Sequence, residues 1–93
     1  MKTLDRITEL EVLVVNADET NAEGRKTIKN SCMELFTLVS GDYQKVGAEE
    51  LVWDMQNDLC CVDWSEPFMV EKAKHSFELY RTIYTIININ RRQ

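Results

Sequence analysis

The chain has 93 residues, of which 44% are hydrophobic and 29% are charged. This size and composition are typical of a single folded domain over residues 1–93, and they exclude an intrinsically disordered tail. The net charge of −5 excludes a uniformly basic surface, so we expect no direct binding to nucleic acid.

The apolar and cysteine patterns indicate in which cellular compartment the protein is expected. The longest apolar run, residues 12–15, is far shorter than the roughly 20 residues that cross a bilayer. The N-terminus has no signal-peptide pattern. Cys32, Cys60 and Cys61 are odd in number and two are adjacent, which does not fit a secreted disulfide framework. We therefore expect a cytoplasmic protein with no membrane contact.

In chain order, the first predicted helix covers residues 3–17. Thr3 can cap it, and Ile7, Leu10 and Val14 recur at helical spacing. Residues 10–15 are rich in β-branched side chains, which favour extended backbone. A short strand over these residues is therefore the main alternative.

The second predicted helix covers residues 20–40. Thr20 and Glu23 have the spacing of a capping box, and Gly24 weakens the first turn by about 1 kcal/mol relative to Ala. Gly41 is predicted to end the helix, and a loop is expected to follow as far as Gly47. One apolar face is formed by Ile28, Cys32, Leu35, Phe36 and Val39.

The third predicted helix covers residues 48–61. Glu50, Asp54 and Asp58 follow one another at four-residue steps, so they form an acidic ridge along one side. Residues 46–71 contain seven acids and no base. The ridge is either a solvated face or a docking surface for a basic protein partner. Trp53 beside it is either a binding anchor or a core residue.

The fourth predicted helix covers residues 65–91 and has an apolar arc of roughly 160°. It would be about 40 Å long, whereas a globule of this size is about 30 Å across, so its end should fray or project. The arc fits the central helix of a bundle. It also suits a self-association seam, because Leu79, Ile83 and Ile86 would lack a cover in a lone domain. We therefore expect a homodimer.

No arrangement of residues indicates catalysis, a cofactor or a metal site. The acids Asp58 and Asp63 would raise the pKa of the nearby thiols Cys60 and Cys61, which disfavours a nucleophile. We interpret this pair as small apolar residues at the buried end of the third helix. His75, the only histidine, is interpreted as a solvated surface residue.

These patterns predict an all-α, small antiparallel bundle of about four helices. The expected function is non-catalytic: a self-associating regulator or inhibitor, of the type carried by phages and mobile elements, that binds another protein. One alternative is an acidic nucleic-acid mimic that blocks a DNA- or RNA-binding enzyme. The other is a small thiol-dependent enzyme that uses Cys60 or Cys61.

Overall fold

The protein is an all-α bundle of four helices in a computed structural model that describes residues 2–46 and 48–91. The helices are α1 (Lys2–Asn16), α2 (Ala22–Val46), α3 (Glu49–Cys60) and α4 (Pro67–Arg91). This confirms the predicted fold class. The alternative strand over residues 10–15 is wrong: these residues lie in α1.

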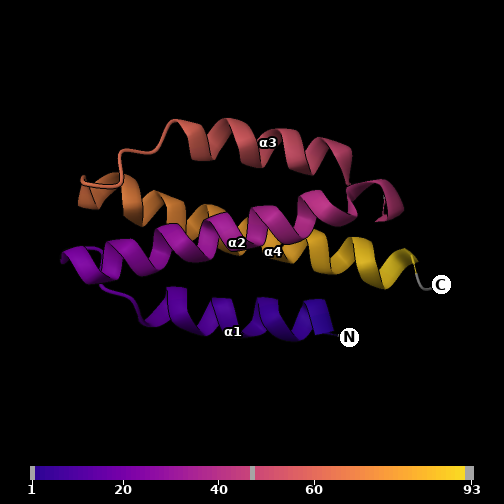
Figure 1. Cartoon of the computed structure of the whole chain (residues 1–93), viewed down its shortest axis with the longest axis horizontal. Helices are drawn as coiled ribbons and strands as arrows, with labels where there is room; N and C mark the ends of the chain where they lie inside the picture. Colours follow the sequence, from indigo (N-terminus) through magenta and orange to yellow (C-terminus); the bar gives the residue numbers. More distant parts are fainter. Residues whose placement is uncertain (1, 47, 92–93) are drawn as a thin grey trace.

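The two long helices, α2 and α4, form the centre of the bundle (Figure 1). Both α1 and α3 pack against this central pair from opposite sides, and among the described residues they do not touch each other. The core holds most of the inward-facing residues predicted from helical spacing. Its largest fully buried side chains are Tyr84, Phe77, Leu10, Ile28, Leu35, Met55, Val14, Val39 and Val70.

The bundle is elongated, with extents of 42 × 24 × 17 Å. The 25 residues of α4 span about 38 Å, and α2, which has the same length, runs beside α4 to about the same ends of the bundle (Figure 1). The expectation that its end frays or projects is therefore wrong for the described residues. A chain this short can accommodate such a helix because a second helix of 25 residues, α2, lies beside it.

Helix α2 continues through Gly41, which was predicted to end it. A Cβ built on Gly41 would meet nothing within 4 Å, so this glycine is not required by any close contact. The added turn carries Asp42, whose carboxylate accepts a hydrogen bond of 3.0 Å from the hydroxyl of the buried Tyr84. This contact with α4 gives the longer helix a tertiary partner. The other predicted end of the loop, Gly47, lies outside the described residues.

The start of α2 also differs from the prediction. The cap is Asn21, whose side-chain oxygen accepts a 2.7 Å hydrogen bond from the Gly24 amide. Thr20 is engaged elsewhere, since both its amide and its hydroxyl donate to Oδ1 of Asp18 at 2.9 and 2.6 Å. The predicted capping box of Thr20 and Glu23 is therefore wrong.

The loop before α4 repeats this arrangement. Asp63 Oδ1 accepts from the amide and the hydroxyl of Ser65 at 3.0 and 2.6 Å. These hydrogen bonds hold the pKa of Asp63 below its ordinary value. Helix α4 then begins at Pro67, two residues after the predicted start, where proline's missing N–H costs nothing.

Candidate protein-binding surface

The acidic ridge of Glu50, Asp54 and Asp58 lies on the exposed side of α3. Leu51, Met55 and Leu59 bury the opposite side of the same helix against the core, which fixes the ridge outward.

The carboxylates of the acidic ridge form no ion pair among the described residues. The ion pairs found among the described residues use Arg6, Lys74 and Arg81, and their acidic partners lie outside α3. None of these pairs includes a ridge carboxylate. The ridge therefore presents negative charge that no basic side chain of the described chain offsets.

Tyr80 connects the acidic ridge to α4. Its hydroxyl donates to the carboxylate of Asp58 and also lies 3.5 Å from the backbone oxygen of Asp54. Because Tyr80 is buried, this contact fixes one edge of α3 against α4. Ile83 follows Tyr80 by three residues, which places it on the same side of α4.

The predicted self-association residues therefore lie beside the ridge, on the neighbouring helix. Leu79 is 56% exposed and Ile86 is 52% exposed. Ile83 is half-buried and packs against the core, so it belongs partly to the monomer. The sequence alone could not show that α3 and α4 bring these two sets of residues together.

Two exposed aromatic residues extend this surface. Trp53 is 60% exposed, which excludes the core interpretation of this residue and leaves it available as an anchor. Phe68 is 61% exposed and its ring lies 4.9 Å from the ammonium of Lys72. The exposure of Phe68 was not predicted from the sequence. Its helical spacing could have found it, since Leu79 and Ile86 follow it at 11 and 18 residues, close to whole numbers of turns.

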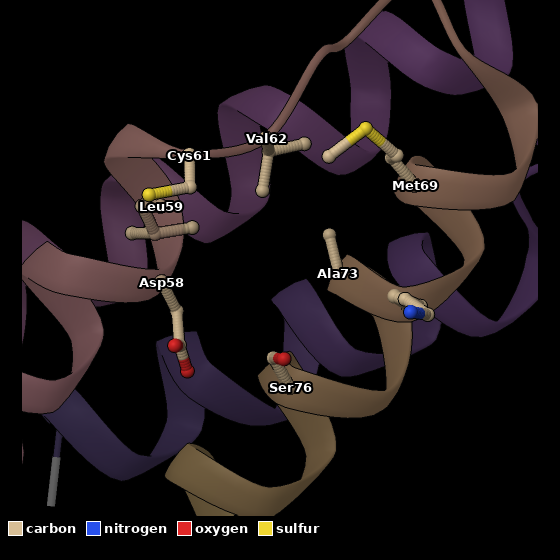
Figure 2. A pocket seen from close by; sticks show the side chains of 8 residues that line it. Asp58, Leu59, Cys61, Val62, Met69, Ala73 and Ser76 are labelled. Atoms are coloured by element: carbon tan, nitrogen blue, oxygen red, sulfur yellow. The ribbon is translucent and has the colours of Figure 1, made fainter.

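A small groove lies where the C-terminal end of α3 meets the first half of α4 (Figure 2). Its volume is about 210 Å³, below the roughly 300 Å³ at which small-molecule sites begin. The groove is the size of a side chain, and Asp58 makes it continuous with the acidic ridge. It is lined by Asp58, Leu59, Cys61, Val62, Met69, Lys72, Ala73 and Ser76.

A second charged cluster lies between α1 and α4. Glu11 and Glu78 share the guanidinium of Arg81. Partial burial, and then the neighbouring Glu78, raises the pKa of Glu11 even though Arg81 acts in the opposite direction. The Oε1 atom of Glu78 is buried without a hydrogen-bond partner. Apart from this atom, Arg81 pairs with one carboxylate oxygen of each acid, so the cluster offers no open carboxylate pair to a ligand.

The cysteine interpretation is wrong: Cys60 and Cys61 are both exposed rather than buried. Cys60 is the last residue of α3 and Cys61 is its C-cap, at the exposed end of the helix next to the core residue Leu59. The pKa of the Cys60 thiol is raised by Cys61, by partial desolvation and by Asp58. Cys32 is the buried cysteine, and burial raises the pKa of its thiol to about 12. Neither shift favours a thiolate nucleophile.

His75 is exposed, as expected for a solvated histidine. Among the described residues, no three His, Cys, Asp or Glu side chains gather closely enough to hold a metal ion. Within the same residues, no helix combines the length and apolarity that crossing a membrane requires.

Comparison with known proteins found no matching family model, no similar curated protein and no similar solved structure.

Proposed function

We propose that the chain is a non-catalytic protein-binding module of the regulator or inhibitor type, which docks a basic protein on the acidic ridge. The observation that carries this proposal is the lack of any basic counterpart to Glu50, Asp54 and Asp58 among the ion pairs of the described residues. An exposed carboxylate that is already paired with a basic side chain of its own chain attracts a basic partner only weakly. These acids retain a field that accelerates association with a basic surface.

The apolar neighbours of the ridge support the same proposal. Charged rims govern the rate of encounter, whereas most binding free energy comes from buried aromatic and apolar anchors. Trp53 on α3 and Leu79 on α4 are both more than half exposed and lie on the two helices that Tyr80 joins. A basic partner helix laid along this edge would contact carboxylates and apolar side chains together.

The test compares two triple variants with the same change in net charge. In the ridge variant, Glu50, Asp54 and Asp58 become Gln, Asn and Asn. In the matched control, three exposed acids on other helices or faces, Asp5, Glu23 and Glu71, become Asn, Gln and Gln. Proteins captured from the native host by wild-type chain are identified by mass spectrometry, and the binding kinetics of the strongest partner are measured against all three chains.

We expect the ridge variant to associate more slowly and with a weaker dependence on salt, while the control behaves like wild type. Circular dichroism should show the same helicity in all three. The side-chain oxygen of the Asp58→Asn variant can still accept from the Tyr80 hydroxyl, and substitutions at exposed positions usually change stability by less than about 0.5 kcal/mol. If the ridge variant binds the partner as wild type does, the ridge is a solvated face and the proposal is wrong.

A second candidate is an acidic nucleic-acid mimic, and the even spacing of the ridge favours it. Side chains four residues apart on one helix repeat about every 6 Å along the axis, which gives an evenly spaced line of negative charge. In that case the basic partner is a nucleic-acid-binding protein, and an oligonucleotide should compete with the wild-type chain for it. A partner that binds the chain and the oligonucleotide simultaneously rejects the mimic while leaving the docking proposal intact.

We also propose that a second copy of the chain covers the exposed α4 residues Phe68, Leu79 and Ile86. Three large side chains that are each more than half exposed along one side of a helix are typical of an interface. Because α4 does not project beyond the bundle, helix length no longer supports this dimer. The exposed residues alone carry it.

A further inference from the structure

A groove lined by three basic side chains lies at the N-terminal end of α2, at the end of the bundle where the α3–α4 loop lies (Figure 1). Its volume is about 380 Å³, and we call it the basic groove. It is lined by Ala22, Arg25, Lys26, Lys29, Trp64 and Ser65. Glu23, Asp63 and Glu66 adjoin lining residues in the chain but do not themselves line the groove.

The bases of the groove carry charge that is not offset within the described part of the chain. None of the ion pairs found there includes Arg25, Lys26 or Lys29. Arg25 is held in place, since its Nη1 donates to the backbone oxygen of Glu19 at 3.2 Å. Lys26 and Lys29 are exposed and lie one helical turn apart. The groove therefore presents positive charge on a chain whose net charge is −5.

The interior of the basic groove suits an aromatic side chain. Lysine and arginine cover apolar surface with their aliphatic stems and keep their charged ends in water. Trp64 is half-buried and adds an indole to the lining, and cations beside an aromatic ring attract it further. The volume of the groove exceeds the roughly 300 Å³ at which sites for small ring compounds begin. The groove is therefore complementary to an aromatic anchor that has carboxylates beside it.

The chain carries such a group of residues on α3. Trp53 is 60% exposed and lies beside Glu50 and Asp54 of the acidic ridge. The ridge acids follow one another at four-residue steps, and Arg25 and Lys29 are also four residues apart, so both helices repeat charge about every 6 Å. Within one described chain, no ion pair joins the two surfaces. A second copy supplies the aromatic anchor and the carboxylates together.

We propose that the acidic ridge and Trp53 of one copy dock into the basic groove of a second copy. The indole of Trp53 enters the groove, and ridge carboxylates pair with Lys26 and Lys29 at its rim. The net charge of −5 on each copy opposes their approach. This repulsion is screened beyond about 8 Å at physiological ionic strength, so the complementary charges at the contact outweigh it.

This contact joins two different surfaces, so one copy keeps a free ridge and the other keeps a free groove. Further copies can add to both, which gives species larger than a dimer. One aromatic anchor and a few rim ion pairs make a small contact, so it should form at higher concentrations than the α4 dimer. An occupied ridge is closed to the basic partner, so the chain limits its own docking as its concentration rises. This last consequence rests on the proposed function, whereas the contact itself does not.

Exchange of charge between the two surfaces tests the contact. The parent chain carries Ile86→Asp, which weakens the proposed α4 contact. The ridge chain adds Glu50→Lys and Asp54→Lys, and the groove chain adds Lys26→Glu and Lys29→Glu. A fourth chain carries all four exchanges, whose charge changes cancel. Sedimentation equilibrium measures association, and circular dichroism checks helicity; a chain that loses helicity is replaced by one with Gln or Asn at the same positions.

We expect the parent chain to associate as its concentration rises, and the ridge and groove chains each to associate at least about tenfold more weakly, because attraction becomes repulsion. An equimolar mixture of the ridge and groove chains should regain the association of the parent, and so should the fourth chain. The proposal is wrong if the parent remains monomeric up to about 1 mM. It is also wrong if either single-surface chain associates as the parent does, or if the mixture does not regain association.

The same chains separate this contact from the docking of a basic partner. The groove chain keeps the acidic ridge, so it should bind the captured partner at least as tightly as the parent does, whereas the ridge chain should bind it more weakly. Weaker partner binding by the ridge chain, with self-association unchanged, rejects only the contact between copies. Self-association that follows the charge exchanges, with partner binding unchanged in the ridge chain, rejects only the proposed docking function.

Discussion

Replacement of Gly24 by alanine should destabilise the protein, although alanine is the better helix former. Gly24 is buried in the first turn of α2, where the α1–α2 loop passes over it. A Cβ atom added here would lie 1.8 Å from the backbone oxygen of Asp18, 2.5 Å from its carbonyl carbon and 2.7 Å from its nitrogen. All three atoms belong to the backbone, so no side-chain rotation can relieve the contact.

The two opposing effects can be compared. Alanine in place of glycine inside a helix gains about 1 kcal/mol. Forcing an extra carbon into a closely packed site costs about 1–3 kcal/mol, and a clash of more than 1 Å with fixed backbone belongs at the upper end. A shift of Asp18 would also disturb the hydrogen bond that its backbone oxygen accepts from the Asn21 amide. The net loss should be about 2 kcal/mol.

Thermal unfolding followed by circular dichroism measures this loss. For a domain of this size, about 2 kcal/mol lowers the Tm by about 8–16 °C. The matched control is Gly41→Ala in the same helix, where a Cβ meets nothing within 4 Å. There the propensity gain is unopposed, and stability should rise by up to about 1 kcal/mol. If Gly24→Ala stabilises the protein as Gly41→Ala does, the close approach of the loop is refuted.

Three further predictions follow from the described contacts. The pKa of Glu11 is raised in the folded state, so its contribution to stability is lost as pH rises through the folded pKa; Glu11→Gln should raise the Tm at pH 7, and the gain should vanish near pH 4. The pKa of Asp63 is lowered, so its contribution is present above about pH 4 and is lost as the pH falls through the folded pKa; Asp63→Asn should lower the Tm at pH 7, and the difference should shrink as the solution is acidified. Wild-type chain should sediment as a dimer at micromolar concentration, and Leu79→Asp or Ile86→Asp should shift the dissociation constant about thirtyfold with helicity retained. A wild-type monomer at high concentration would reject the dimer, whereas loss of helicity in both variants would place these side chains in the monomer core.

The sequence was sufficient to predict the four helices and their buried faces, because apolar spacing reports which side of a helix leaves water. It was less informative about where the helices begin and end. Glycine is a residue that commonly ends a helix, and Gly41 was therefore predicted to end α2. The helix continues instead, and the next residue, Asp42, accepts a hydrogen bond from Tyr84, which lies far away in the chain. Such a contact overrides local preference and leaves no local signal.

The candidate surface likewise combines features that residue spacing predicts with features that only the tertiary packing decides. The acidic ridge follows from four-residue spacing, and so does the exposed side of α4. Their adjacency depends on the packing of α3 against α4 through Tyr80, which no spacing rule reveals. The exposure of Cys60 and Cys61 was missed because cysteine is usually buried, and that tendency outweighed the position of the pair at the exposed end of α3.

Over the part of the chain that the structure describes, α1 and α3 do not touch, which divides the bundle into parts that can open separately. Either outer helix can detach while the other still covers its side of the central pair, so amide hydrogen exchange should be slowest in α2 and α4. A ligand that binds only the closed form of α3 would slow exchange in α3 by mass action and leave α1 unchanged. The position of an unknown partner can therefore be read from which outer helix becomes protected, before any complex is crystallised.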